Sequence, residues 1–308
     1  MVFFRYSRFT LIALLACGIL GFTGCGTVRT VGEKISPFGL VKKMMPRTAQ
    51  LNKRVMLFDP VDQAGYGPEI VSGIAAQMRA MIEDHSRFIV EMPPEGVEWK
   101  DAGLDLRIAA PVDLLDFCRE EGISTIITLM LSPVESTPKT TGIWPFRTQS
   151  IVFSIPVRLT ALDVVNGTVL LTQSVAEEDV IKLYDAEMST DRELLDRFAS
   201  RVIPRVVSRQ VRELVEEMDR WLWRGSIVAV EENKAIINAG KDLGIKEGSR
   251  FEVLGEGEAI VARDGRTLTR SGGPIAELVI TEPGARKSVA ESAEKVHLEP
   301  GLTIRYKP

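Results

Sequence analysis

The sequence is poor in the residues that most often carry chemistry. It has only two histidines, His85 and His297, and three cysteines in 308 residues. Neither histidine lies near another candidate ligand at metal-site spacing, so we predict no metal. No Ser/His/Asp set, nucleophile elbow or phosphate-binding glycine loop occurs either. We therefore expect no cofactor, no small-molecule substrate and no enzymatic activity.

The chain also lacks an excess of positive charge. Its 38 basic and 42 acidic residues give a net charge of −4. A mildly acidic chain gives no reason to expect nucleic-acid binding.

Long apolar runs are absent except at the amino terminus, where residues 1–24 have the features of a signal peptide. Arg5 and Arg8 are followed by the apolar run from Phe9 to Phe22, which is short for a membrane span. An uncleaved anchor or a buried apolar segment is the alternative interpretation.

The tetrad Phe22-Thr23-Gly24-Cys25 resembles the lipobox of bacterial lipoproteins, although Phe22 replaces the usual Leu. The resemblance implies cleavage before Cys25 and attachment of lipid to that cysteine. A competing lipobox ends at Cys17, but cleavage there leaves an h-region of only about five residues. In the sorting rule of the family, Gly26 after the cysteine implies the outer membrane, facing the periplasm.

The mature chain divides into three parts. Residues 25–53 are predicted to form a tether: over residues 26–52 the sequence lacks periodicity and carries five basic residues against the single acid Glu33. Its positive charge would suit anionic headgroups, and an ordinary polar linker is the alternative. Residues 54–223 predict a periplasmic α/β domain, and residues 224–308 predict a small barrel of about five short strands. The fold class is α+β: an α/β sandwich with a mixed sheet, followed by a small SH3-like β-barrel.

Patterns within the first domain are specific enough to place its elements. Apolar runs predict strands near residues 55–58, 88–92 and 123–131, and helical periodicity marks residues 68–84 and 111–122. Residues 151–161 alternate as a strand that turns at Asn166-Gly167. Pro156 places this strand at an edge or a bulge. We expect residues 132–149 to form a polar loop.

A long amphipathic helix completes the first domain. Thr190 and Glu193 form a capping box at its start, Pro204 is expected to kink or divide it, and Arg224-Gly225 is expected to end it. Cys118 lies in an apolar helical pattern and is expected to be buried. Trp221 and Trp223 are expected to pack between the two domains.

The glycine-punctuated stretch from Gly225 to Val253 resembles the carboxy-terminal SH3-like domain of flagellar assembly protein T. The middle domain is similar to periplasmic domains of that protein, the curli secretion lipoprotein and lipoprotein activators of peptidoglycan synthases. The resemblance implies a non-enzymatic assembly, scaffold or regulatory protein with envelope protein partners. The segment 133–149 is too short for the two membrane-crossing strands of the curli protein, so we predict no pore.

One segment of the predicted loop is a candidate partner contact. Trp144 and Phe146 stand in the stretch Gly142-Ile-Trp-Pro-Phe-Arg147, and exposed aromatic side chains there would suit a protein or a membrane. Folding of the loop onto its own domain is the alternative. Two further functions stay open: a peptidoglycan- or polysaccharide-binding module, and a lipid-anchored hydrolase with two facing carboxylates.

Overall fold

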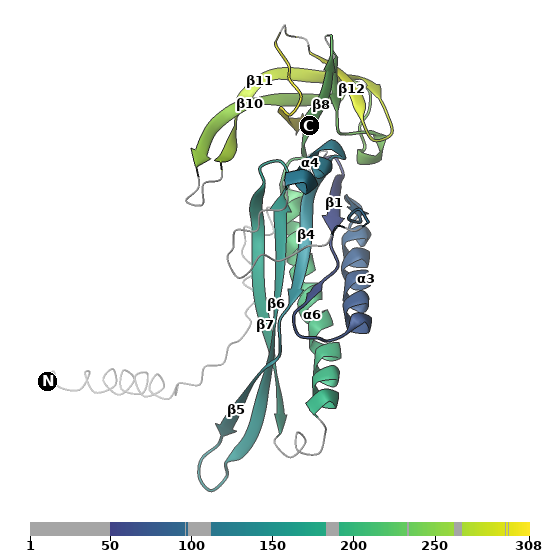
Figure 1. The fold of residues 1–308 in the computed structure, drawn as a ribbon. Coiled ribbons are helices and arrows are strands. Elements are labelled where there is room, and N and C mark those ends of the chain that lie inside the picture. Colours follow the sequence, from purple (N-terminus) through teal and green to yellow (C-terminus); the bar gives the residue numbers. More distant parts are fainter. Residues whose placement is uncertain are drawn as a thin grey trace, which may run out of the picture. The chain divides into compact units, whose positions relative to one another are not determined.

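The computed structural model describes residues 50–95, 97, 112–182, 191–232, 234–261, 267–292, 294 and 296–308. The predicted signal peptide, Cys17, Cys25 and nearly all of the tether therefore lie outside the described residues, as does Thr190 of the capping box. Thr48–Pro308 form one compact unit that contains both a mixed sheet and a closed barrel (Figure 1). The predicted α+β fold with a small barrel is confirmed.

The mixed sheet has seven strands, in the order β3-β1-β4-β6-β5, with β2 on β4 and β7 on β6. Its amino-terminal strands β1, β3 and β4 are parallel, because α3 and α4 return the chain to the same end of the sheet. β6 pairs antiparallel with β4, β5 and β7. The strands are β1 Lys53–Leu57, β2 Val61–Asp62, β3 Phe88–Glu91, β4 Ile123–Leu131, β5 Glu135–Thr141, β6 Thr148–Asp163 and β7 Thr168–Lys182.

Two helices cover one face of the sheet and one helix covers the other. Side chains on α3 (Pro68–Asp84) and α6 (Asp191–Arg220) share a core with alternate residues of β1, β4 and β6. The remaining alternate residues, Met56 and Ile126 among them, pack with Leu114 and Cys118 of α4 (Val112–Glu120). Cys118 is fully buried, as predicted.

The barrel closes in the order β10-β11-β12-β9-β8-β13. Its strands are β8 Arg224–Glu231, β9 Lys234–Ile237, β10 Arg250–Val261, β11 Thr267–Pro283, β12 Ser288–Ser292 and β13 Thr303–Lys307. Trp223 packs in the barrel core, edge-on to Phe251 at 5.6 Å, and Trp221 packs against the sheet core. The two tryptophans thus divide between the two cores.

Several strand predictions were wrong. Residues 132–149 are not a loop, because β5 pairs along the first half of β6 and continues the hairpin to Thr141. The three threonines of β5 suit a strand although all seven of its residues are exposed.

Pro156 does not place its strand at an edge or a bulge. β6 is paired on both sides, and the bulge falls at Ala161 and Leu162. On one side β6 pairs with β5 up to Ser154 and with β4 from Val157, so Pro156 lies between these two pairings. Its carbonyl accepts a hydrogen bond from Ser132 N at 3.1 Å on that side, and its missing N–H faces the same way. No ladder bond is lost there.

The long helix was also predicted with errors. α6 is one helix of 30 residues that includes Pro204, so the proline does not divide it, and the helix ends at Arg220 rather than at Arg224-Gly225. The carbonyl of Pro204 accepts hydrogen bonds from Gln77 Nε2 at 2.9 Å and Ser208 Oγ at 2.8 Å. The hydrogen bond from Gln77 ties α6 to α3 at the proline, whereas that from Ser208 lies within α6.

Candidate functional site

The β5–β6 hairpin ends in a tip formed by Ile143–Phe146, where the predicted contact residues lie. Ile143, Trp144 and Phe146 are 80%, 80% and 81% exposed. Phe146 N donates to Ile143 O at 2.7 Å, which closes the turn. Trp144 and Phe146 therefore do not fold back onto their own domain, and the structure shows them exposed as a contact surface requires.

The geometry of the tip depends on Gly142. Its φ of +97° is in the region that favours glycine, and an added Cβ would lie 2.2 Å from Phe146 O. Any larger residue would therefore open the turn. Lys139 and Arg147 flank the apolar residues, and both are exposed.

A second feature joins the sheet to the barrel, and we call it the Arg54 seam. Arg54 in β1 is fully buried, and its Nε and Nη2 donate to one carboxylate oxygen of Asp242 at 2.9 and 2.6 Å. Its Nη1 donates to Glu121 O at 2.8 Å and Asn238 O at 3.3 Å. The guanidinium thereby satisfies acceptors from the α4–β4 turn and from the barrel simultaneously.

Further polar contacts extend the seam. Asn238 Nδ2 donates to Arg119 O at 2.6 Å, and Arg286 pairs with Glu91 at 3.0 Å and with Glu121 at 3.3 Å. Gly122 has a φ of +70°, and an added Cβ would lie 2.1 Å from Asn238 O. The barrel backbone can approach this closely only because residue 122 has no side chain.

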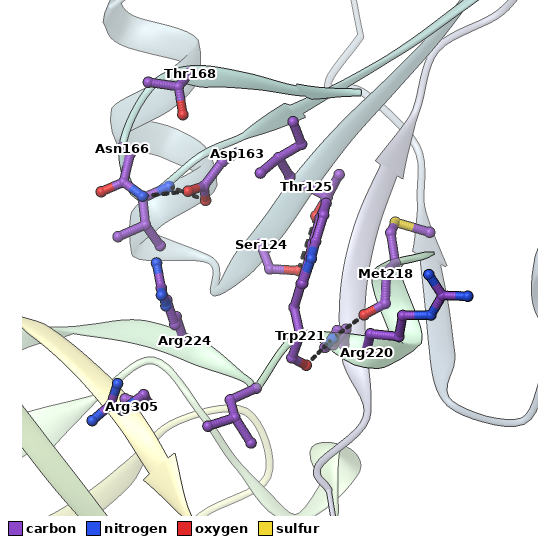
Figure 2. Close-up of a pocket in the computed structure, with 14 residues that line it drawn as sticks. Ser124, Thr125, Asp163, Asn166, Thr168, Met218, Arg220, Trp221, Arg224 and Arg305 are labelled. Carbon is purple, nitrogen blue, oxygen red and sulfur yellow. Dashed lines mark hydrogen bonds between the residues drawn. The ribbon is translucent and has the colours of Figure 1, made fainter. Parts of the chain in front are cut away.

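The third feature is a cavity of about 460 Å³ between the sheet, the end of α6 and the barrel (Figure 2). This volume falls in the range of small-molecule sites. The described residues that line it are Lys53, Ser124, Thr125, Asp163, Val165, Asn166, Thr168, Leu170, Met218, Arg220, Trp221, Leu222, Arg224 and Arg305.

Two buried charges lie at the cavity wall. Asp163 accepts from Asn166 Nδ2 at 2.5 Å and from Val165 N at 3.1 Å. Burial raises its pKa, which these hydrogen bonds and Arg224 oppose. Lys53 donates to the carbonyls of Met218 and Trp221 at the end of α6, and burial lowers its pKa to about 8.

Three arginines give the cavity a cationic rim. Arg224 and Arg305 occupy paired positions on β8 and β13, and Arg305 is held by Glu252 through two hydrogen bonds. Arg220 pairs with Glu217 at 2.6 Å. Figure 2 shows the guanidinium of Arg224 directed toward the region of Asn166.

The described residues contain no group of three His, Cys, Asp or Glu side chains that could hold a metal ion. Within the same residues, no helix has the length and apolar character needed to cross a membrane. His297 is exposed beside Glu299, and His85 lies next to Phe88. Asp113, Asp116 and Glu120 are exposed on α4.

The basic side of α6 has partners that the sequence did not indicate. Arg201 pairs with Asp179, and both Arg205 and Arg209 lie near Glu177 at 3.8 and 3.9 Å. These acids belong to β7, not to the helix. The Arg54 seam and the cavity were likewise missed, because their residues lie far apart in the sequence; Arg54 and Asp242 are 188 positions apart.

No family model and no curated protein sequence matches the chain. Several solved structures resemble parts of it. A putative neuraminyllactose-binding hemagglutinin homologue from Helicobacter pylori is 12% identical, with 56% of this chain and 90% of that chain covered, at a TM-score of 0.34.

Two further solved structures are similar at the same level. The hypothetical protein CT253 from Chlamydia trachomatis is 14% identical, covers 55% and 96% of the two chains and has a TM-score of 0.28. Lipoprotein GNA1162 from Neisseria meningitidis is 12% identical, covers 55% and 99%, and has a TM-score of 0.25. Likenesses this low carry no argument about function, and the resemblance to flagellar assembly protein T stays a prediction.

Proposed function

We propose that the chain is a lipoprotein of the outer membrane, attached through lipid on Cys25 and facing the periplasm. In this proposal it is a non-enzymatic assembly or scaffold factor for an envelope machine of the flagellar, secretion or wall-synthesis type. The sequence order of basic residues, apolar run, small residues and cysteine supports the anchor.

The observation that carries the scaffold role is the pair of hairpins that extend past the two cores. β5 and β6 run on to the exposed tip, and β10 and β11 continue to Val261 and Thr267 after β13 has stopped pairing at Leu254. Beyond Leu254 the β10–β11 hairpin is a two-stranded ribbon, which gains little stability by itself and whose free edges can accept another strand. In the other hairpin β6 also pairs with β7, and the free edge is that of β5. Such projections are suited to binding other molecules.

The Arg54 seam supports the same role. It joins the barrel to the sheet through an ion pair whose arginine is fully buried and through several backbone acceptors, so a force applied to one part, or a partner bound to it, is transmitted to the other. A scaffold needs that stiffness.

The anchor is tested by labelling cells with radioactive palmitate. We expect label on the wild type and on Cys17→Ala, and none on Cys25→Ala. Label retained on Cys25→Ala would contradict the anchor.

The scaffold role is tested by photo-crosslinking in intact cells from position 275, at the base of the β10–β11 ribbon, where Ile275 is 43% exposed. We expect a discrete protein adduct from this position and none from position 169, a similarly exposed control on β7. Absence of any protein adduct from the ribbon would contradict the scaffold proposal.

The cavity favours a second candidate function, binding of peptidoglycan or another polysaccharide. Trp221 offers an aromatic face, and Asn166 and Arg224 offer donors for hydroxyl and carboxylate groups. Only one of the described lining residues, Asp163, is a carboxylate, whereas most glycoside hydrolases use two. Calorimetry with soluble muropeptides would test it: Arg224→Gln should weaken binding and Arg250→Gln, outside the cavity, should not.

A further inference from the structure

We infer that the tip at Ile143–Phe146 inserts into the interfacial layer of the membrane that holds the lipid anchor, giving the chain a second membrane contact. This inference rests on the proposed anchorage at Cys25, but it concerns a different part of the chain. Four observations lead to it: the shape of the tip, its size, its charge and the reach of the tether.

The tip has the shape and composition of an interfacial contact. Its three large apolar side chains are all about four-fifths exposed at the end of a hairpin, and the neighbouring strand β5 is exposed along its whole length. Tryptophan at a membrane interface places its ring at the headgroup level, with apolar neighbours below it. A bilayer accepts such a protruding group without a complementary pocket.

The size of the tip argues against a standard protein interface. Such an interface uses about 20–30 residues on each side. The apolar tip offers only four consecutive residues, and polar residues surround it: Thr140 and Thr141 before it, and Thr148 and Gln149 after it. Insertion into lipid buries these few side chains without further contacts.

The charge behind the tip suits an anionic membrane. From Ser136 to Gln149 the chain carries Lys139 and Arg147 and no acidic residue. Lys139 pairs in register with Ser150, which on its other side pairs with Lys182 of β7. Basic residues therefore occupy the positions just behind the apolar group, where lipid phosphates would lie.

The tether is long enough for both contacts. β1 pairs beside the part of β4 that faces Asp163, so Gln50 lies near the Asp163 end of β6. From there to Thr148 the 15 steps of β6 rise about 50 Å. The 24 residues from 26 to 49 have a contour of about 80 Å, so the lipid on Cys25 and the tip can occupy one membrane surface.

The test uses the full lipidated protein, reconstituted in vesicles of phosphatidylethanolamine and phosphatidylglycerol that contain lipids brominated on the acyl chain. The emission of Trp144 is obtained as the difference between wild type and Trp144→Phe, which removes the indole but keeps an aromatic ring. We expect this emission to be blue-shifted and quenched by the bromolipid. Ile143→Ser/Phe146→Ser should lose the quenching, whereas Val180→Ser, an exposed apolar control on β7, should keep it.

Flotation of the same vesicles separates the two proposals. Protein that floats while Trp144 stays unquenched would overturn the tip inference and leave the anchor intact. Protein that does not float would overturn the anchor, and the inference with it. A blue shift of Trp144 that requires an added envelope protein, without bromolipid quenching, would also overturn the inference and favour a protein partner for the tip.

Discussion

The Arg54 seam and the tip belong to one compact unit, yet their side chains are satisfied in opposite ways. At the seam, a fully buried guanidinium has Asp242 and three backbone carbonyls as acceptors, and a glycine makes room for them. At the tip, three large apolar side chains contact almost nothing in the chain. The seam therefore contributes to folding and the tip is available for binding.

Removal of the seam carboxylate should have the largest effect on stability. In Asp242→Ala the buried Arg54 charge keeps only carbonyl partners, which we expect to cost about 3–5 kcal/mol of unfolding free energy. Chemical denaturation measures it. The control Glu217→Ala removes the carboxylate of an exposed pair with Arg220 and should cost less than about 1 kcal/mol; equal costs would show that burial of Arg54 is unimportant.

A pair of glycine variants should separate crowding at the seam from backbone strain. Gly122→Ala and Gly244→Ala both place a side chain at positive φ, which costs about 1–2 kcal/mol. Only Gly122 has Asn238 O within reach of the new Cβ, so its cost should exceed that of Gly244 by about 2 kcal/mol or more. Thermal or urea unfolding measures the loss of stability in both variants. Similar losses would contradict close packing at Gly122.

The pH dependence of stability should report on Lys53. The folded chain releases this proton near pH 8, whereas the unfolded chain holds it up to about pH 10.5. The unfolded state therefore binds more protons in this window, and the contribution of Lys53 to stability rises with pH by at most about 3 kcal/mol.

The carbonyls of Met218 and Trp221 favour the charged lysine, so the rise should fall short of that limit. Urea unfolding between pH 8 and 10 measures it as the difference between the wild type and Lys53→Met, because Cys118 and Tyr66, whose folded-state pKa values burial raises to about 12, ionise first in the unfolded chain and lower stability over the same range. The stability of Lys53→Met should rise less with pH than that of the wild type, and the exposed control Lys241→Met should match the wild type. Equal profiles for the wild type and Lys53→Met would contradict the lowered pKa of Lys53.

Substitutions at the tip should have the smallest effect on stability. Replacement of Ile143, Trp144 and Phe146 by serine removes almost no buried surface, so unfolding free energy should change by less than about 0.5 kcal/mol. Phe198→Ala in the sheet core, where the ring is 1% exposed, should cost about 3–5 kcal/mol by comparison. A large loss of stability on substitution of the tip would mean that the tip packs against the chain, and its contrast with the Arg54 seam would be wrong.

Local patterns in the sequence were sufficient for much of the fold. The helix at Pro68–Asp84 and the strand at Ile123–Leu131 have the predicted bounds, because periodic apolar residues and flanking turns mark them directly. β5 was missed because its polar, exposed residues show no apolar alternation, and its strand conformation depends on pairing with β6. The prediction for Pro156 was wrong because a strand paired on both sides accepts a proline where the missing N–H faces no pairing strand. Only the tertiary structure shows which strand faces each residue.

By itself, the sequence determined where apolar faces, turns and the candidate lipid cysteine stand along the chain, since each is a property of neighbouring residues. It also identified Trp144 and Phe146 as candidate contacts. Only the tertiary structure decided that these residues are exposed, that Arg54 meets Asp242 and that Asp163, Trp221 and Arg224 share a cavity. The last two facts depend on segments more than 50 residues apart that meet only when the sheet and the barrel have formed.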